Sequence, residues 1–259
     1  MRAFLATVGL LLATGVAAIA VADDAELRVG VQNERPPFSF SDDNGELQGF
    51  DVEIAGALCA ALKVRCDLIA LEFTDLIPSL QEGRIDAAVA SMSITEERLQ
   101  LVDFTEKYYR ASNRFVARRG ADFEIAPESL VGKTIGVKRG TIHDRYLSEQ
   151  YARMASIRRY GYSDEIFIDL ALGRLDLAFA DGITLTESFL KTELGTGFDF
   201  VGPALSDSRW FGRGEGIAVR KGNVDLLARL SRALREIRSD GTYEEIRIKH
   251  FDYDIYGDA

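Results

Sequence analysis

The sequence predicts an α/β protein made of two similar units that face a common cleft. A twelve-residue segment occurs twice, at 80–91 and 170–181, with Leu, Gly, Arg, Asp, Ala and Ala at the same offsets. Each copy reads as a helix end, a Gly-Arg turn and a short apolar strand. A strand ending in Gly-Val at 28–31 also recurs at 134–137. Because ligands bind beyond the carboxyl ends of strands in open α/β sheets, two such units predict one site between two lobes.

Taken alone, the repeat also fits two unrelated packing units of similar shape. Glycine after a helix is a common left-handed cap, and aspartate before a strand suits a turn. The alternation of elements around each copy favours duplication, because the same kinds of segment recur in the same order.

The elements of the first half follow from local patterns. Residues 27–31 form an apolar strand, 50–62 show helical apolar spacing, and 74–82 form a second helix that Pro78 limits. Residues 86–90 are small and apolar, as in a buried parallel strand. The first unit is therefore expected to alternate strands with helices.

The second half repeats this layout and then adds a C-terminal part. Strands are expected at 134–137 and 175–180, with helices at 143–151, 166–172 and 185–194. A strand near 214–220 and helices at 224–237 and 243–251 follow. No Pro-rich or Ser-rich linker separates the halves, so short strands near 109–113 and 202–207 are expected to join the lobes. The predicted division is 23–110 with 206–259 for lobe 1 and 111–205 for lobe 2.

Composition and charge exclude several classes of function. The chain has 259 residues, 47% hydrophobic and 28% charged, which is typical of a globular protein with a sizeable core. The net charge of −10 argues against nucleic acid and anionic membranes as partners.

The N-terminus reads as a secretory signal peptide. A basic start at Arg2 precedes an apolar run at 4–16, which is too short to span a bilayer comfortably. An Ala-Val-Ala cleavage pattern at 20–22 follows, which predicts a signal peptide over 1–22 cleaved after Ala22. The protein is therefore expected in the periplasm; an uncleaved membrane anchor is the alternative.

The cysteines are predicted to pair. Cys59 and Cys66 flank a helix-to-strand turn, and export would place them in an oxidising compartment. Two free buried thiols are the alternative. Only two histidines exist and neither lies near the cysteines, so zinc is not supported and no cofactor is expected.

The segment after the first repeat copy carries the strongest chemical signal. Ser93 and Glu96 have capping-box spacing, which predicts a helix that starts at residue 94. Free N–H groups at that helix end and the guanidinium of Arg98 would suit a carboxylate. The alternative is a surface helix whose Arg98 is solvated or pairs with Asp103.

The second copy ends on a carboxylate, Asp181, which could receive an ammonium group. Arg98 and Asp181 on opposite sides of the cleft would then bind the carboxylate and the ammonium group of an α-amino acid. Gly140 and Thr141 precede a helix and offer further N–H donors. The alternative for Asp181 is a helix cap. Phe73, next to the 74–82 helix, is an aromatic candidate for contact with a ligand side chain.

Several segments together resemble the polar amino-acid-binding proteins of bacterial ABC importers, including the lysine/arginine/ornithine-, histidine- and opine-binding proteins. The resemblance covers residues 26–257 and the cysteine pair. The segments are Gly-Phe-Asp-Val-Glu at 49–53, Leu-Ile-Pro-Ser-Leu at 76–80, Ser-Ile-Thr-Glu-x-Arg at 93–98, Gly-Lys-x-x-Gly-Val at 132–137 and Asp-Gly-Thr-Tyr-Glu at 240–244.

The resemblance implies a two-lobed type II periplasmic-binding fold with a two-stranded hinge and a ligand cleft. It implies that Arg98 and the Ser93 backbone hold a ligand carboxylate and that Asp181 holds the amine. Ser91 and the turn at Thr141 and Ile142 would complete the main-chain site, and Phe73 would stack on the ligand side chain. The implied partners are an amino acid and inner-membrane ABC permease subunits, with the protein acting as a monomer.

The sequence departs from the basic-amino-acid binders at positions expected to set specificity. Those relatives carry aspartate where Gln32 stands, tyrosine where Arg35 stands and an apolar residue at Lys138. Arg35, Lys138 and Arg139 would favour a second acidic group on the ligand, whereas Glu34 nearby has the opposite sign. The general amino-acid site is therefore expected to carry over, without its side-chain specificity.

Two other functions remain open at this point. A periplasmic enzyme of the cyclohexadienyl dehydratase kind uses the same fold, and Glu34 or His143 in the cleft could act as an acid or base. The alternative for these two side chains is a ligand contact, for which His143 is a candidate, or a place on the surface. The sequence shows no nucleophile elbow and no metal cluster, which argues against catalysis. A sensor for a receptor kinase would need a separate membrane partner.

Overall fold

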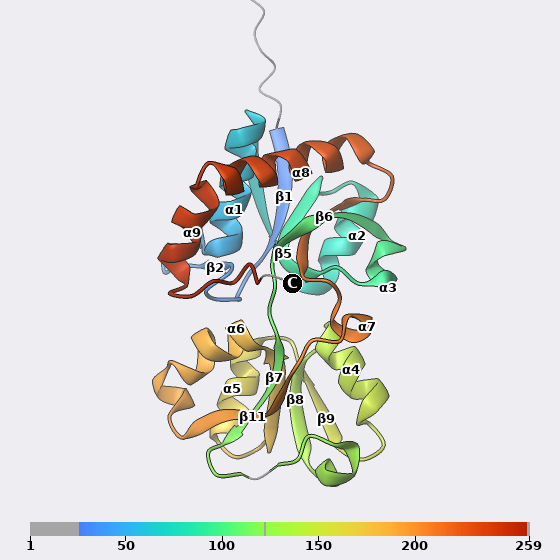
Figure 1. Cartoon of the computed structure of the whole chain (residues 1–259), viewed down its shortest axis with the longest axis vertical. Helices are drawn as coiled ribbons and strands as arrows, with labels where there is room; N and C mark the ends of the chain where they lie inside the picture. Colours follow the sequence, from blue (N-terminus) through green and yellow to red (C-terminus); the bar gives the residue numbers. More distant parts are fainter. Residues whose placement is uncertain (1–25, 122, 258–259) are drawn as a thin grey trace, which may run out of the picture.

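The apolar strands of the chain assemble into two sheets, and the computed structural model therefore has two α/β lobes (Figure 1). It describes residues 26–121 and 123–257. The predicted signal peptide lies outside the described residues.

The sheet of the first lobe has the strand order β4-β1-β5-β12-β6. Its strands are β1 (Glu26–Gln32), β4 (Arg65–Leu71), β5 (Ala87–Ser93), β6 (Val102–Tyr109) and β12 (Glu215–Arg220). A small hairpin of β2 (Phe40–Ser41) and β3 (Leu47–Gln48) lies beside them. Its helices are α1 (Phe50–Leu62), α2 (Leu76–Glu82), α3 (Glu96–Leu99), α8 (Val224–Ser239) and α9 (Thr242–His250), with a 3₁₀ turn at Phe73–Asp75.

The sheet of the second lobe has the order β11-β7-β10-β8-β9. Its strands are β7 (Asn113–Arg118), β8 (Thr134–Lys138), β9 (Ser156–Tyr160), β10 (Leu177–Asp181) and β11 (Phe198–Leu205). Its helices are α4 (Ile142–Gln150), α5 (Ser163–Ala171) and α6 (Gly182–Leu185), with 3₁₀ turns at Pro127–Leu130 and Glu193–Gly195. Short α7 (Ser208–Phe211) lies where the chain returns to the first lobe (Figure 1).

The two sheets share one topology, which accounts for the sequence repeat. Strands β4, β1 and β5 run parallel in the first lobe, as β9, β8 and β10 do in the second. Each set is then flanked by an antiparallel strand that arrives from the other lobe, β12 in the first and β7 in the second. Even the register matches, because Gly30 pairs with Ala88 and Gly136 with Ala178. The expectation of a duplicated α/β layout is confirmed.

The Gly and Asp residues that the two repeat copies share have the same structural role in both lobes. Gly83 and Gly173 follow α2 and α5 with φ of 73° and 71°, a left-handed conformation that glycine adopts without a Cβ penalty. The carboxylates of Asp86 and Asp176 each accept a backbone N–H from the neighbouring strand, β1 and β8, at 3.0 and 2.9 Å. Each aspartate therefore holds the start of one parallel strand against the next.

The C-terminal helices cover the first lobe. Residues of α1, α8 and α9 share one hydrophobic core with β1, β5 and β12, and Figure 1 shows α8 lying across this lobe on the side away from the second. The long C-terminal segment therefore completes the lobe in which the chain begins. Within the described ranges, no helix combines the length and apolarity needed to cross a bilayer.

The predicted disulfide is confirmed. Cys59 near the end of α1 is bonded to Cys66 in β4, with a Cα–Cα distance of 5.8 Å. The bridge closes a short loop, since the two residues are separated by 7 positions. It ties the first helix of the lobe to its edge strand.

Two predicted helix features are wrong. Strand β5 continues through Ser93, which pairs with Glu215, so Ser93 is not a helix cap. Helix α3 begins two residues later, with Thr95 as its N-cap. The predicted helix at 185–194 is instead α6 followed by a π-helical turn, Thr186–Leu190. Beyond this turn the N–H and the hydroxyl of Thr192 both donate to the Phe189 carbonyl.

Candidate functional site

A pocket of about 60 Å³ lies between the lobes at the carboxyl ends of the parallel strands. Gln32 ends β1, Ser93 ends β5, Lys138 ends β8 and Asp181 ends β10. The structure brings together all the candidate ligand-binding residues of the sequence around this pocket. They are Gln32, Arg35, Phe73, Ser91, Ser93, Arg98, Lys138, Thr141, Ile142, His143 and Asp181.

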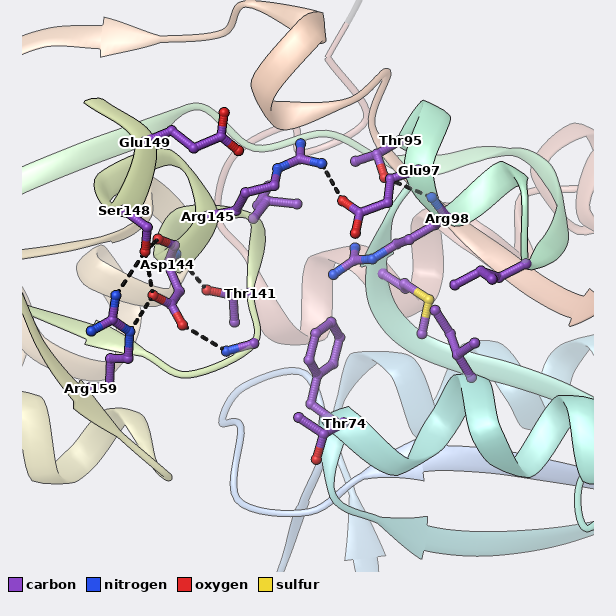
Figure 2. Close-up of a pocket in the computed structure, with 16 residues that line it drawn as sticks. Thr74, Thr95, Glu97, Arg98, Thr141, Asp144, Arg145, Ser148, Glu149 and Arg159 are labelled. Atoms are coloured by element: carbon purple, nitrogen blue, oxygen red, sulfur yellow. Dashed lines mark hydrogen bonds and ion pairs between the residues drawn. The ribbon is translucent and has the colours of Figure 1, made fainter. Parts of the chain in front are cut away.

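A larger hollow of about 520 Å³ adjoins the pocket and opens to solvent between α3 and α4. Figure 2 shows its two walls: Glu97 and Arg98 project from the first lobe, and Asp144, Arg145 and Ser148 from the second. An ion pair between Arg145 and Glu97 spans the opening. The lobes therefore already touch across the entrance.

Arg98 lies in α3 and points its guanidinium into the cleft. Its Nη1 donates to the Ser93 carbonyl at 3.1 Å, and the guanidinium lies over the Phe73 ring at 5.1 Å. Burial, reinforced by the nearby charge of Arg145, lowers the pKa of Arg98 to about 10. Among the described residues no carboxylate forms a salt bridge with it.

The alternative partner proposed for Arg98 is excluded by geometry. The Asp103 carboxylate instead binds Lys221 Nζ at 2.6 Å and the Gly222 N–H at 2.7 Å. Arg98 therefore faces the pocket as a cation that forms no direct ion pair with a carboxylate of residues 26–121 or 123–257.

Asp181 has two partners within the protein. It is the N-cap of α6, accepting the Thr184 N–H at 2.8 Å through Oδ1, as the alternative interpretation of the sequence expected. Its Oδ2 accepts from Arg35 Nη2 at 2.9 Å. Burial alone would raise the pKa of Asp181, but the charge of Arg35 and the Thr184 N–H outweigh it and hold the pKa below its ordinary value. Asp181 is therefore a buried carboxylate anion paired across the lobes.

Ser91 lines the pocket, but both of its donor groups are used within the protein. Its hydroxyl donates to Asp51 at 2.7 Å and its N–H donates to the Tyr108 hydroxyl at 2.8 Å. Ser91 has φ of 52°, a left-handed conformation uncommon for a residue with a Cβ. Backbone strain of this kind is tolerated where the surrounding contacts determine the conformation, as the buried Asp51 network does here.

Lys138 and Gln32 meet across the cleft. Lys138 Nζ donates to Gln32 Oε1 at 3.3 Å, and the Gln32 amide donates to the Ala90 carbonyl at 2.8 Å. Burial, together with the positive charge of Arg35, lowers the pKa of Lys138 to about 8. The side of the pocket expected to contact the ligand side chain is thus cationic. Its burial disfavours the charged form of Lys138.

His143 is a buried neutral imidazole. Its Nε2 lies 2.7 Å from Asn113 Oδ1, and the ring packs edge-on against Phe179. Burial, opposed by the negative charge of Asp181 and reinforced by the positive charges of Arg35 and Arg98, lowers the pKa of His143 to about 4. The ring therefore carries no charge near neutral pH.

Comparison with known proteins identifies the family to which the chain belongs. The model of the bacterial extracellular solute-binding proteins, family 3, matches residues 27–253. The chain belongs to that family. It is 44% identical to the L-arginine-binding protein of Pseudomonas aeruginosa, over 91% of this chain and 92% of that protein. It is 39% identical to the histidine-binding periplasmic protein of Escherichia coli, over 89% of each. A solved structure of an ancestral arginine-binding protein bound to arginine superposes with a TM-score of 0.79, at 36% identity over 88% of this chain and 98% of that one.

Sequence reasoning missed four polar residues of this solute-binding protein's pocket: Asn113, Ser163, Thr184 and Glu215. Asn113 begins β7, Thr184 lies in the first turn of α6, and Glu215 begins β12. Glu215 follows a glycine at the start of a predicted strand, so its acidic side chain in an otherwise apolar run was the available signal.

Proposed function

We propose that this solute-binding protein captures a polar or charged L-amino acid, opines included, between its lobes and delivers it to an ABC permease. The observation that carries the proposal is the pairing of opposite charges in one interlobe pocket. The Arg98 cation has no ion-pair partner among the described residues, and the Asp181 carboxylate faces the same pocket from the other lobe. An α-amino acid presents the complementary carboxylate and ammonium groups.

The names of the relatives support an amino-acid ligand. The Pseudomonas protein is named for L-arginine and the Escherichia coli protein for histidine. The side chains that differ from basic-amino-acid binders, Gln32, Arg35 and Lys138, lie together at one side of the pocket and would set the preference for the ligand side chain.

Capture would proceed by closure of one lobe on the other about the two crossing strands. The proposed division is residues 23–110 with 206–259 for the first lobe and 111–205 for the second, since the chain passes between the sheets after β6 and after β11. A ligand that contacts both lobes stabilises the closed state by its differential affinity for that state. We further propose export by cleavage after Ala22 and action as a monomer.

We also infer that binding is not followed by a reaction. The relatives are named as binding proteins, and His143 is neutral and engaged with Asn113, which suits a structural role. Incubation with prephenate or arogenate, followed by chromatography, is expected to give no product. Enzyme-dependent formation of an aromatic product would contradict this inference.

The experiment for the binding function is a thermal-shift screen of the purified mature protein. Each of the twenty L-amino acids and a representative opine is tested singly, with the matching D-amino acids as controls. A ligand at 100 times its Kd stabilises the folded state by about 2.7 kcal/mol, so a true ligand raises the Tm measurably. A screen in which no amino acid or opine raises the Tm of the folded protein would overturn the proposal. Loss of uptake of the radiolabelled ligand on deletion of the gene would support delivery to a permease.

A further inference from the structure

Glu215 is a buried acid in the pocket, and one of its two carboxyl oxygens has no hydrogen-bond partner among the described residues. It begins β12, the first strand after the chain returns from the second lobe, and only 7% of its surface is exposed. Its Oε1 accepts a hydrogen bond from the Ser93 hydroxyl at 3.4 Å. Its Oε2 has no hydrogen-bond partner, and it is the only side-chain oxygen in that condition among the buried atoms of the described residues. Since leaving a buried polar atom unpaired costs free energy, a ligand group is the natural partner for it.

Asp181, the residue that sequence analysis assigned to the ligand amine, is less available than Glu215. Each Asp181 oxygen already accepts a hydrogen bond, one from the Thr184 N–H and one from Arg35. Glu215 lines the same pocket with one oxygen still free. The unoccupied acceptor is therefore at the start of β12, and the occupied one at the end of β10.

Ser93 places this free oxygen at the correct end of an amino acid. Arg98 donates to the Ser93 carbonyl, while the Ser93 side chain donates to Glu215. The guanidinium of Arg98 and the carboxyl group of Glu215 thus both contact Ser93. An α-carboxylate bound to Arg98 would leave the α-ammonium group, attached to the next carbon, beside Glu215.

The charges around Glu215 determine its protonation. Burial and the negative charge of Asp181 on β10 raise the pKa of Glu215, while Arg35 on the β1–β2 connection, the Ala111 N–H and the Ser93 hydroxyl oppose the rise. The net effect is a pKa of about 8. Arg98 on α3 and Tyr109 on β6 also face it. In the empty pocket at pH 7 the Glu215 carboxyl is therefore mostly protonated. A ligand ammonium placed between Glu215 and Asp181 would remove the repulsion between the two acids.

We propose that Glu215 receives the α-ammonium group of the bound amino acid, beside Asp181, and releases its own proton to solvent when the ligand binds. This assignment rests on the proposed amino-acid function. In the step, the O–H bond of the Glu215 carboxyl breaks, the proton passes to the buffer, and the resulting carboxylate accepts an N–H from the ligand.

The test is calorimetry of the mature protein with the tightest-binding member of the amino-acid screen. Titrations at pH 7 in phosphate and in Tris, buffers of different ionisation enthalpy, give the number of protons released. The wild type is expected to release close to one proton, and its affinity should rise nearly tenfold per pH unit between pH 6 and 7.5. In Glu215→Gln the proton release should disappear and the affinity should fall roughly 10- to 100-fold.

Two comparisons separate this role from a general disturbance. Glu106→Gln changes a carboxylate on neighbouring β6 that pairs with Arg235 outside the pocket, and should alter neither affinity nor proton release. The 2-hydroxy acid analogue of the ligand lacks the ammonium group, so Glu215→Gln should weaken its binding less than about twofold.

The outcomes distinguish this inference from the proposed function. If the wild type binds an amino acid without releasing a proton and with pH-independent affinity, the Glu215 assignment is wrong while the function stands. The assignment also fails if Glu215→Gln weakens the hydroxy acid as much as the amino acid, because Glu215 would then act on the carboxylate. A folded wild type that binds no amino acid would overturn the function itself, and this inference with it.

Discussion

Replacing Arg98 by alanine should abolish tight ligand binding and leave the fold intact. The guanidinium reaches into the pocket, is held by the Ser93 carbonyl and the Phe73 ring, and forms no salt bridge with any described carboxylate. A bidentate contact with a ligand carboxylate supplies two charge-assisted hydrogen bonds, each worth about 1.5–3 kcal/mol. Their loss amounts to about 3–6 kcal/mol, or a roughly 10²- to 10⁴-fold weaker Kd.

Calorimetry measures the affinity and circular dichroism the thermal stability. The matched control is Arg213→Ala, which removes an exposed arginine near α3 whose contact with Glu96 is 3.8 Å, and which should bind as the wild type does. Arg98→Lys keeps the charge without the bidentate geometry, so its affinity should lie between that of Arg98→Ala and that of the wild type. An Arg98→Ala protein that binds within tenfold of the wild type would refute the assignment of Arg98 to the ligand carboxylate.

Three further outcomes concern the scaffold. Reducing the Cys59–Cys66 bridge should lower the free energy of unfolding by roughly 2–3 kcal/mol in the chain-entropy model, measured by denaturant titration with and without reductant; two thiols that react in the denatured, unreduced protein would show that no bridge forms. Asp86→Ala and Asp176→Ala should each destabilise the protein by about 1–3 kcal/mol, because each leaves a strand N–H without its carboxylate; equal stability to the wild type would mean that these contacts are dispensable. Burial raises the pKa of Asp51 to about 6, above its unfolded value, so the native state takes up a proton as pH falls through 6. Relative to Asp51→Asn, the wild type should therefore gain about 1.3 kcal/mol of stability between pH 7 and pH 5, and a constant difference between the two denaturation curves would contradict this.

The layout of the scaffold could be predicted because its signals are local. The glycine of each Gly-Arg turn follows from the left-handed conformation that ends a helix, and the small apolar strand after it from burial on both faces. Because the segment at 80–91 recurs at 170–181, the elements expected in one unit could be compared with those of the other. Local patterns failed for the helix expected at 185–194, and also where a distant strand intervened. Pairing with Glu215 keeps Ser93 in β5, and Thr95 becomes the cap of α3.

The residues around the pocket could be predicted in part. Asp181 is the last residue of the second repeat copy and of β10, and Arg98 lies in α3, directly after the strand of the first copy, so the chain order places both beyond the carboxyl ends of parallel strands. The resemblance to amino-acid binders added Gln32, Arg35 and Lys138, which the structure also places at the pocket. Asn113, Ser163, Thr184 and Glu215 were missed because none belongs to a motif that carries chemistry by itself.

The sequence by itself determined that two copies of one α/β unit face each other, because helix caps, turns and apolar strands depend on neighbouring residues. Only the tertiary structure decided which charges meet. Arg35 and Asp181 are 146 positions apart and Ser93 and Glu215 are 122 apart, and no local pattern relates the members of either pair. The physical reason is that an ion pair or a hydrogen bond depends on distance in space, and here that distance is set by strands that cross from one lobe to the other.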